Sequence, residues 1–191
     1  MKRNLFVVLL LTTLVSVYTG CSNDDDNSTP GVPYEPTQGQ LADGPEPGKS
    51  FLHWNATGVQ RAAVVDNEVS GWCYHGVATE ISIPDMLGLS VQAASLAGDS
   101  LQCTIQVTDT GYTQTEYAPE GTEWADSVSY WVNDAVVELP QGVQPQDVTF
   151  YWYRRDDGTF FEVPTQYTNG QWIAKTVHFS RYILGQKRSA N

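Results

Sequence analysis

The chain has few side chains that could bind a metal or hold a cofactor. A structural zinc site needs four Cys or His ligands, usually in local pairs. Cys73 and His75 form one such pair at a tight spacing, and no second pair accompanies them. The sequence therefore predicts no metal and no cofactor, and we interpret the histidines as core or surface residues. They are His53, His75 and His178.

The serines and carboxylates do not form a recognisable catalytic site either. Ser90 has a glycine two residues before it but none two residues after it, so the nucleophile elbow of hydrolases is incomplete. The paired carboxylates Asp156 and Asp157 are explained by a hairpin turn, whose backbone Asp tolerates. Gly-rich phosphate-binding loops do not occur. We therefore predict that the protein is not an enzyme.

Aromatic side chains are the feature with most functional promise. The chain has six tryptophans and ten tyrosines, some in runs at 130–131 and 151–153. Neighbours on a strand point to opposite faces, so if Phe150 and Trp152 fill the core, the tyrosines beside them face outward. An outer aromatic shelf suits stacking on a sugar ring or anchoring a protein partner, whereas packing under loops or across strands is the alternative. The candidate contacts are Tyr151, Tyr153, Arg155 and Trp131.

Residues 1–20 have the layout of a secretory signal peptide. Two basic residues precede an apolar run over residues 5–17, which is shorter than the ~20 residues that a membrane-spanning helix needs. The ending Val17-Tyr18-Thr19-Gly20-Cys21 resembles the lipobox of bacterial lipoproteins, although Tyr18 and Thr19 depart from its tightest form. The resemblance implies a lipid on Cys21 that holds the protein to a membrane. An ordinary secretory signal that contains a cysteine is the alternative.

Residues 21–50 form a tether in our interpretation. Five prolines and almost no aliphatic residues follow Cys21, so the segment cannot bury enough apolar surface to offset its ordering entropy. Its start, Ser22-Asn23-Asp24-Asp25-Asp26, resembles the acidic export signal of Bacteroidetes surface lipoproteins. The resemblance implies an outer-membrane lipoprotein exposed at the cell surface, and a solvated spacer is the alternative.

Charge limits the partners. The formal net charge is −12, and removal of Lys2 and Arg3 with the signal leaves eight basic against twenty-two acidic residues, or −14. Such a balance disfavours nucleic acid and anionic membrane surfaces, which reward clustered Lys and Arg. The remaining partners are the membrane through the lipid on Cys21, and a glycan or an envelope protein.

Cys73 and Cys103 remain as an even pair if Cys21 carries lipid, in a compartment that permits disulfides. Closing a loop of about thirty residues would stabilise the fold by roughly 3 kcal/mol. Two separately buried thiols are the alternative, because free cysteine is often buried as a small hydrophobe. The sequence leaves both open.

Residues 51–185 have the size of one domain, followed by a tail at 186–191. Residues 101–108 alternate apolar and polar, which predicts a strand with Cys103 on its buried face. Residues 135–139 predict another strand, and residues 84–97 irregular structure with at most a short helix.

Two hairpins are predicted near the C-terminus. Asp157-Gly158 separates strands at 148–155 and 159–163, and Asn169-Gly170 begins a second hairpin. The sequence therefore predicts an all-β fold, an antiparallel β-sandwich with a C-terminal β-meander and at most one short helix.

The C-terminal half of the domain resembles ZU5-like β-sandwich modules. The features that carry the resemblance are Ala135-Val136-Val137-Glu138-Leu139-Pro140, Phe150-Tyr151-Trp152-Tyr153, Phe161-Glu162-Val163-Pro164, Val177-His178-Phe179-Ser180-Arg181-Tyr182-Ile183-Leu184 and the earlier Ile81-Ser82-Ile83-Pro84. Such modules act chiefly as interaction and architectural units, so the resemblance implies no enzyme activity. We expect a surface-tethered, non-catalytic binding or architectural module. The alternative is an accessory subunit of a larger envelope assembly, joined by strand addition.

Replacing Cys21 tests the anchor. We expect Cys21→Ala to abolish partitioning with membranes, because no other residue would carry the lipid. The measurement is the share of the protein in the membrane fraction after cell fractionation. A variant that still partitions like the parent would contradict lipidation at Cys21.

Overall fold

The computed structural model describes residues 51–154, 156 and 158–187, in which strands dominate. The predicted signal peptide (1–20), the tether (21–50) with Cys21, Arg155 and the tail beyond residue 187 lie outside the described residues. The strands are β1 (His53–Trp54), β2 (Glu68–Tyr74), β3 (Thr79–Ile83), β4 (Leu87–Val91), β5 (Ser100–Val107), β6 (Gln114–Ala118), β7 (Glu123–Asn133), β8 (Val137–Glu138), β9 (Val148–Arg154), β10 (Thr159–Val163), β11 (Thr165–Thr168), β12 (Gln171–His178) and β13 (Arg181–Gln186). The helices are α1 (Ala56–Val64) and the short 3-10 helices η2 (Asp134–Val136) and η3 (Pro145–Asp147).

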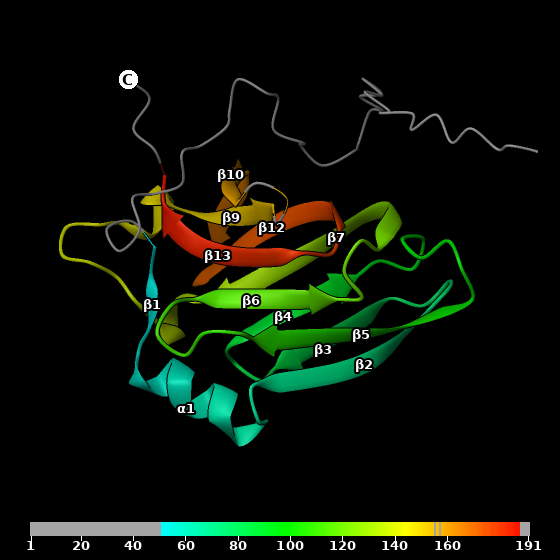
Figure 1. The fold of residues 1–191 in the computed structure, drawn as a ribbon, viewed down its shortest axis with the longest axis horizontal. Helices are drawn as coiled ribbons and strands as arrows, with labels where there is room; N and C mark the ends of the chain where they lie inside the picture. The colour runs from blue at the N-terminus through cyan, green and yellow to red at the C-terminus, as the bar shows by residue number, and fades with distance from the viewer. Residues whose placement is uncertain (1–50, 155, 157, 188–191) are drawn as a thin grey trace, which may run out of the picture.

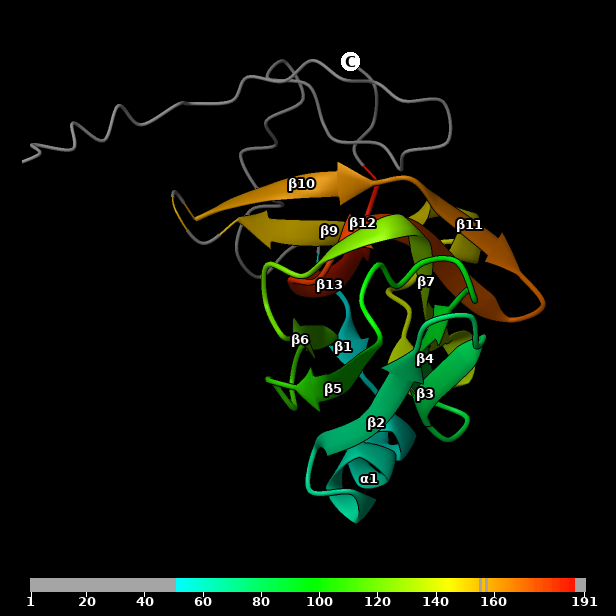
Figure 2. The same ribbon diagram turned by 90° about the vertical axis from the view of Figure 1, so that its right-hand side faces the viewer.

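Two antiparallel sheets pack face to face. One has six strands in the order β10-β9-β13-β6-β5-β2, and the other has five in the order β11-β12-β7-β4-β3. The six-stranded sheet lies in front in Figure 1, and the view turned by 90° shows the two layers with α1 at the bottom (Figure 2). The predicted all-β antiparallel sandwich is confirmed.

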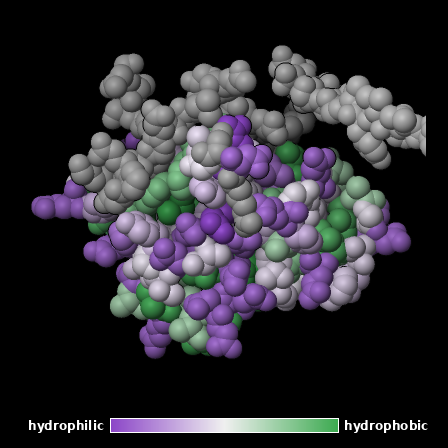
Figure 3. All heavy atoms as spheres, viewed as in Figure 1, coloured by the Kyte–Doolittle hydropathy of each residue, from purple (hydrophilic) through white to green (hydrophobic). Residues whose placement is uncertain are grey.

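Inward-facing side chains of both sheets form the core. On β5, Cys103, Ile105 and Val107 are buried, while Gln102 and Gln106 on the opposite face are exposed. The predicted alternation over 101–108 is therefore confirmed. On the outer side, Figure 3 shows hydrophilic and intermediate residues over much of the face in view, with apolar residues in separate small patches. This is the pattern of strands with one buried and one solvated face.

A tyrosine cluster joins the two sheets at the centre of the core. Tyr117 on β6 and Tyr182 on β13 meet Tyr130 on β7, with ring centroids 4.1 Å and 4.6 Å from that of Tyr130. All three are fully buried. The Tyr130 hydroxyl donates a hydrogen bond of 2.6 Å to the carbonyl oxygen of His178, so its polar end is satisfied inside the sandwich.

The helix α1 covers one end of the sandwich. Asn55 caps it, because its side-chain oxygen accepts a 3.0 Å hydrogen bond from the backbone N–H of Gly58. A Cβ at Gly58 would lie 2.6 Å from the carbonyl oxygen of Val136, so only glycine allows this close approach to η2. Within the described part of the chain, no helix has the length and apolar character needed to span a membrane.

Two segments differ from their predicted structure. Residues 87–91 are the strand β4, not irregular chain, because β4 pairs with β3 on one side and β7 on the other and buries Leu87, Leu89 and Val91. The strand predicted over 135–139 shrinks to the two residues of β8. Asn133 accepts a hydrogen bond from the N–H of Ala135, which favours the 3-10 turn η2 there instead.

Both predicted hairpins are present, as β9–β10 and β11–β12. Asn169 and Gly170 have φ values of 50° and 77°, the left-handed backbone that a two-residue hairpin turn requires. The hairpins lie in different sheets, because the chain crosses from the six-stranded to the five-stranded sheet at Pro164, and β13 then returns to pair with β9. The predicted C-terminal meander is therefore not one continuous run of neighbouring strands. The last strand extends to Gln186, one residue beyond the predicted domain end.

Because of the buried tyrosine cluster, we expect the protein to lose stability at alkaline pH. Burial raises the pKa of Tyr117, Tyr130 and Tyr182 above the ordinary value of 10.0. The unfolded chain ionises these phenols near pH 10 and the folded chain does not, so their contribution is fully present below pH 10 and is lost as the pH rises further. Above pH 10, we expect each of these tyrosines to lower the free energy of unfolding by about 1.4 kcal/mol for every further pH unit. Urea unfolding between pH 8 and 11 measures the slope, and Tyr182→Phe should reduce it.

Candidate functional site

The predicted ligand contacts do not gather in one place. Trp131 lies on β7, on the outer face of the five-stranded sheet, whereas Tyr151 and Tyr153 belong to β9 in the six-stranded sheet. Arg155 lies outside the described residues. The single shelf predicted from the sequence is therefore not formed by these residues.

Tyr151 is buried, so its prediction as an outward-facing contact is wrong. Its side chain has no exposed surface, and its hydroxyl donates a 2.6 Å hydrogen bond to the carbonyl oxygen of Gln186. The ring of Phe51 packs edge-on against it at 6.0 Å between centroids. Phe51 bridges to Gly185 in β13, and this N-terminal segment covers the face of β9 that alternation alone would leave to solvent.

Tyr153 and Trp152 line a small hollow of about 230 Å³. Both rings are half-buried and already have partners in the fold. The indole N–H of Trp152 donates a 2.8 Å hydrogen bond to the hydroxyl of Ser180. The guanidinium of Arg181 lies 5.6 Å from the centroid of the Tyr153 ring, and Phe160 packs on the same ring at 4.9 Å. Little flat aromatic surface remains for a ligand here.

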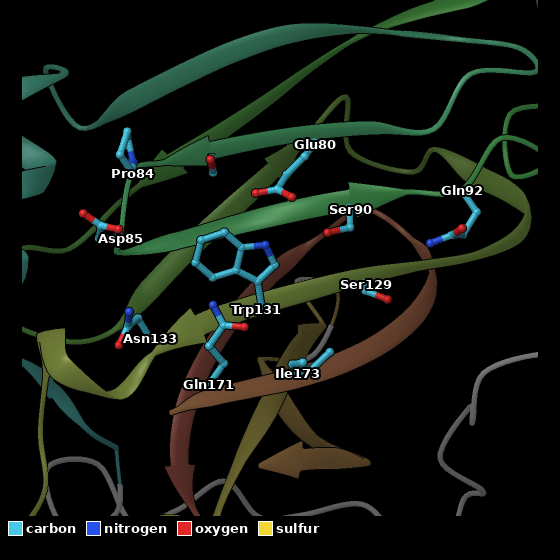
Figure 4. A pocket seen from close by; sticks show the side chains of 11 residues that line it. Glu80, Pro84, Asp85, Ser90, Gln92, Ser129, Trp131, Asn133, Gln171 and Ile173 are labelled. Carbon is cyan, nitrogen blue, oxygen red and sulfur yellow. The ribbon is translucent and has the colours of Figure 1, made fainter. Parts of the chain in front are cut away.

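Trp131 lies in a larger hollow of about 570 Å³ on the outer face of the five-stranded sheet. We call this the Trp131 hollow. Figure 4 shows the indole over β4, with the side chains of Glu80, Ser90 and Gln171 around it. The side chains that line it are mostly polar: Glu80, Ser82, Pro84, Asp85, Ser90, Gln92, Ser129, Trp131, Asn133, Gln171 and Ile173.

Strand register brings these residues together. Gly88, Trp131 and Ile173 lie side by side across β4, β7 and β12. Ser90 pairs with Ser129 in the neighbouring row, and Asn133 pairs with Gln171 on the other side of Trp131. Because alternate residues share a face, the three rows all present outward side chains.

The indole of Trp131 lies directly on the backbone of Gly88. A Cβ placed on Gly88 would come within 2.6 to 2.8 Å of the indole atoms Cζ2, Cε2 and Nε1. Gly88 is buried beneath the ring, while Trp131 itself is half-buried. The missing side chain at position 88 therefore lets the indole lie against the sheet as a flat platform.

Electrostatically, the Trp131 hollow carries acidic and neutral groups. Asp85 stands at one end, where it is 78% exposed and 2.9 Å from the guanidinium of Arg61. Arg61 also donates a 2.8 Å hydrogen bond to the carbonyl oxygen of Pro84, which ties the β3–β4 turn to α1. Glu80 is exposed on β3. None of the described residues that line the hollow is Lys, Arg or His.

The histidines and cysteines lie away from the Trp131 hollow. His53 stacks on Tyr112, His75 bonds to the carbonyl oxygen of Leu96 at 2.7 Å, and His178 lies beside Trp152. In the part of the chain that the structure describes, no three metal-ligating side chains come together. Cys73 and Cys103 are free thiols here with their sulfurs 3.3 Å apart, so the disulfide stays a prediction.

Comparison with protein-family models and with curated proteins gives no match. The resemblances to lipoproteins and to ZU5-like modules therefore stay predictions.

Sequence reasoning identified Trp131 but missed its polar neighbours. Glu80, Ser90 and Gln171 occupy the outward positions of their strands, and alternation could have placed each on a solvated face. Alternation does not give the order of the strands, which brings together residues as far apart in the chain as Glu80 and Gln171.

Adding a methyl group at Gly88 should displace the platform. We expect Gly88→Ala to shift the fluorescence and near-ultraviolet circular dichroism of Trp131 and to cost roughly 1–3 kcal/mol of stability through overpacking. Gly98→Ala is the matched control, because a Cβ there would meet nothing within 4 Å. Identical spectra for the two variants and the parent would show that the indole does not rest on Gly88.

Proposed function

We propose that the domain is a non-catalytic glycan-binding module that captures an uncharged oligosaccharide in the Trp131 hollow, displayed at the cell surface by a lipid on Cys21. The observation that carries the proposal is the indole of Trp131 lying flat over Gly88 inside a polar-lined hollow of about 570 Å³. The sequence of residues 1–50 supports the lipid anchor and the tether. The residues of the Trp131 hollow support a glycan as the ligand.

The platform suits the apolar face of a sugar ring. A pyranose presents C–H groups on its faces and hydroxyls around its edge. It therefore stacks on an aromatic ring and forms hydrogen bonds with polar groups beside that ring. Trp131 offers the flat surface, and Ile173 beside it extends the apolar contact. Sites of this composition, one aromatic surface with a few placed polar groups, are typical of small-ligand recognition.

The polar groups around the indole suit hydroxyls. Ser90 and Gln171 can each donate and accept hydrogen bonds, and Glu80 accepts them. Asp85 is paired with Arg61, but Glu80 adds a negative charge and the described lining holds no Lys, Arg or His, so an anionic sugar would meet repulsion from Glu80. These charges favour a neutral glycan over a uronate or a sulfated one.

The hollow is rigid and elongated. Its lining spans β3, β4, β7 and β12, and three spacings between neighbouring strands amount to about 14 Å. That length suits several linked sugar rings. Because each strand is hydrogen-bonded to its neighbours, the side chains are held in place before the ligand arrives, which lowers the entropy cost of binding.

Both carboxylates of the hollow lack the surroundings of a catalytic acid. Glycoside hydrolysis uses a pair of carboxylates, one of them with a raised pKa in a desolvated setting. Glu80 is exposed, and Asp85 is exposed and paired with Arg61. Capture without cleavage is the function that this arrangement favours.

Strand addition within an envelope assembly is the second candidate. The observation that favours it is the seven-residue edge strand β2, which has a partner on one side in its sheet and carries two exposed aromatics, Trp72 and Tyr74. A partner strand could pair with this edge.

A glycan array followed by titration calorimetry tests the leading proposal, with protein that lacks residues 1–21 so that no lipid is attached. We expect binding to neutral oligosaccharides, weakened about 30-fold or more by Trp131→Ala, the loss expected for a central aromatic anchor. Trp72→Ala is the matched control, because Trp72 is 52% exposed on the other sheet. Unchanged affinity in Trp131→Ala, or no binding to any glycan, would contradict the proposal and favour strand addition.

A charge comparison sharpens the same experiment. A uronate oligosaccharide of equal length should bind at least about tenfold more weakly than its neutral counterpart. Glu80→Gln should narrow that gap, because it removes one repelling charge without changing the size of the side chain. Preferred binding of the uronate would contradict the predicted ligand class and leave the position of the site unaffected.

A further inference from the structure

We propose that Cys73 and Cys103 are a disulfide site that covalently joins the edge strand β2 to β5. The inference is independent of the glycan-binding proposal, because the two sulfurs lie on the six-stranded sheet, away from the Trp131 hollow.

Register places the two cysteines as diagonal neighbours. Gly71 pairs with Cys103, and Cys73 pairs with Leu101, so both cysteines point to the same inward face. Gly71 has no side chain to stand between the sulfurs. Their separation is 3.3 Å, and a bond of about 2.05 Å requires closure by roughly 1.3 Å. Side-chain rotation with a small shift of an edge strand can supply that movement.

Both sulfurs are buried inside the sandwich, with no exposed surface. An oxidant therefore reaches them when β2 opens or before the sheet has closed. In its sheet β2 is bonded only to β5, and it ends the sheet. Edge strands are the elements that open most readily, so the site is accessible by local opening.

The chemistry is thiol–disulfide exchange with a small disulfide oxidant. Cys73 attacks one sulfur of oxidised glutathione as a thiolate and releases one glutathione thiolate. Cys103 then loses its proton, attacks the Cys73 sulfur of the mixed disulfide and releases the second glutathione. Two protein thiols are oxidised, and one glutathione disulfide is reduced to two thiols, which take up the two protons.

Position in the sheet favours Cys73 as the first nucleophile. Cys73 lies on the edge strand β2, which opens, whereas Cys103 lies on β5 between β2 and β6. The hydrogen bond between the two thiols lowers the pKa of Cys73, while that bond and burial raise the pKa of Cys103, which favours the same order.

The disulfide would restrain the edge strand β2, which carries exposed aromatic side chains. Trp72 and Tyr74 flank Cys73 on the outer face of β2, are 52% and 51% exposed, and stack with centroids 6.4 Å apart. An edge strand that carries exposed aromatics is a template for unwanted pairing with other chains. Joining β2 to β5 limits the opening that would expose its backbone.

The test uses the full chain with Cys21→Ser, so that Cys73 and Cys103 are the thiols that remain. The protein is incubated with oxidised glutathione, both folded and during refolding from urea. We expect the two thiols to disappear together and non-reducing peptide mapping to recover a linked Cys73–Cys103 peptide. Absence of that peptide both from the folded sample and from the refolded sample would overturn the proposal.

Stability provides the second readout. The oxidised chain should unfold at a temperature higher by on the order of 10 °C than the reduced chain, because the bridge restricts the unfolded state. The amides of β2 should also exchange with solvent more slowly. The variant that also carries Cys73→Ser and Cys103→Ser should not respond to oxidant. A bridged chain that unfolds at the same or a lower temperature would show that the fold does not accommodate the bond.

Discussion

Pairing of β7 with β12 on one side and β4 on the other is the interaction on which the rest of the structure depends. β7 is the longest strand, with eleven residues, and it is the central strand of the five-stranded sheet. Its inward residues Val128, Tyr130 and Val132 are all buried. Of its outward residues, Ser129, Trp131 and Asn133 line the Trp131 hollow. A slip of one residue would exchange the two sets and destroy core and site together.

The two sheets are held together by large side chains that have polar ends. Trp172 on β12 is fully buried and donates a 2.7 Å hydrogen bond to the carbonyl oxygen of Pro145. The Tyr130 hydroxyl likewise donates a hydrogen bond to the carbonyl oxygen of His178, at the end of the neighbouring strand β12. Each ring buries apolar area, and its hydrogen bond avoids the cost of an unsatisfied polar group. The same bonds give direction to the packing, because each fixes one ring against one backbone atom.

The aromatic residues differ in how much of each ring other parts of the fold cover. Tyr151 is covered by Phe51, and Trp152 and Tyr153 pack with Ser180 and Arg181. Trp131 differs because its partner on the neighbouring strand β4 is Gly88. Its ring therefore lies on the sheet and is not covered by another element. The exposed pair on β2 differs again, since no further strand of its sheet lies beyond it. Position in the sheet, more than residue type, decides which aromatic surface is available to a ligand.

The sequence by itself determined the fold class, the two C-terminal hairpins and the strand that carries Cys103. These features depend on local rules, because alternation and Asn-Gly or Asp-Gly turns act over a few residues. It also singled out Trp131. It misplaced Tyr151 and left residues 87–91 unassigned as a strand, since burial by Phe51 and pairing with β3 and β7 are contacts between distant segments. The helix α1 was not predicted, although its Asn55 cap is a local feature. Only the tertiary structure decided which polar residues surround Trp131. Strand order and register bring Glu80, Ser90 and Gln171 together, and no short-range pattern encodes which strands become neighbours.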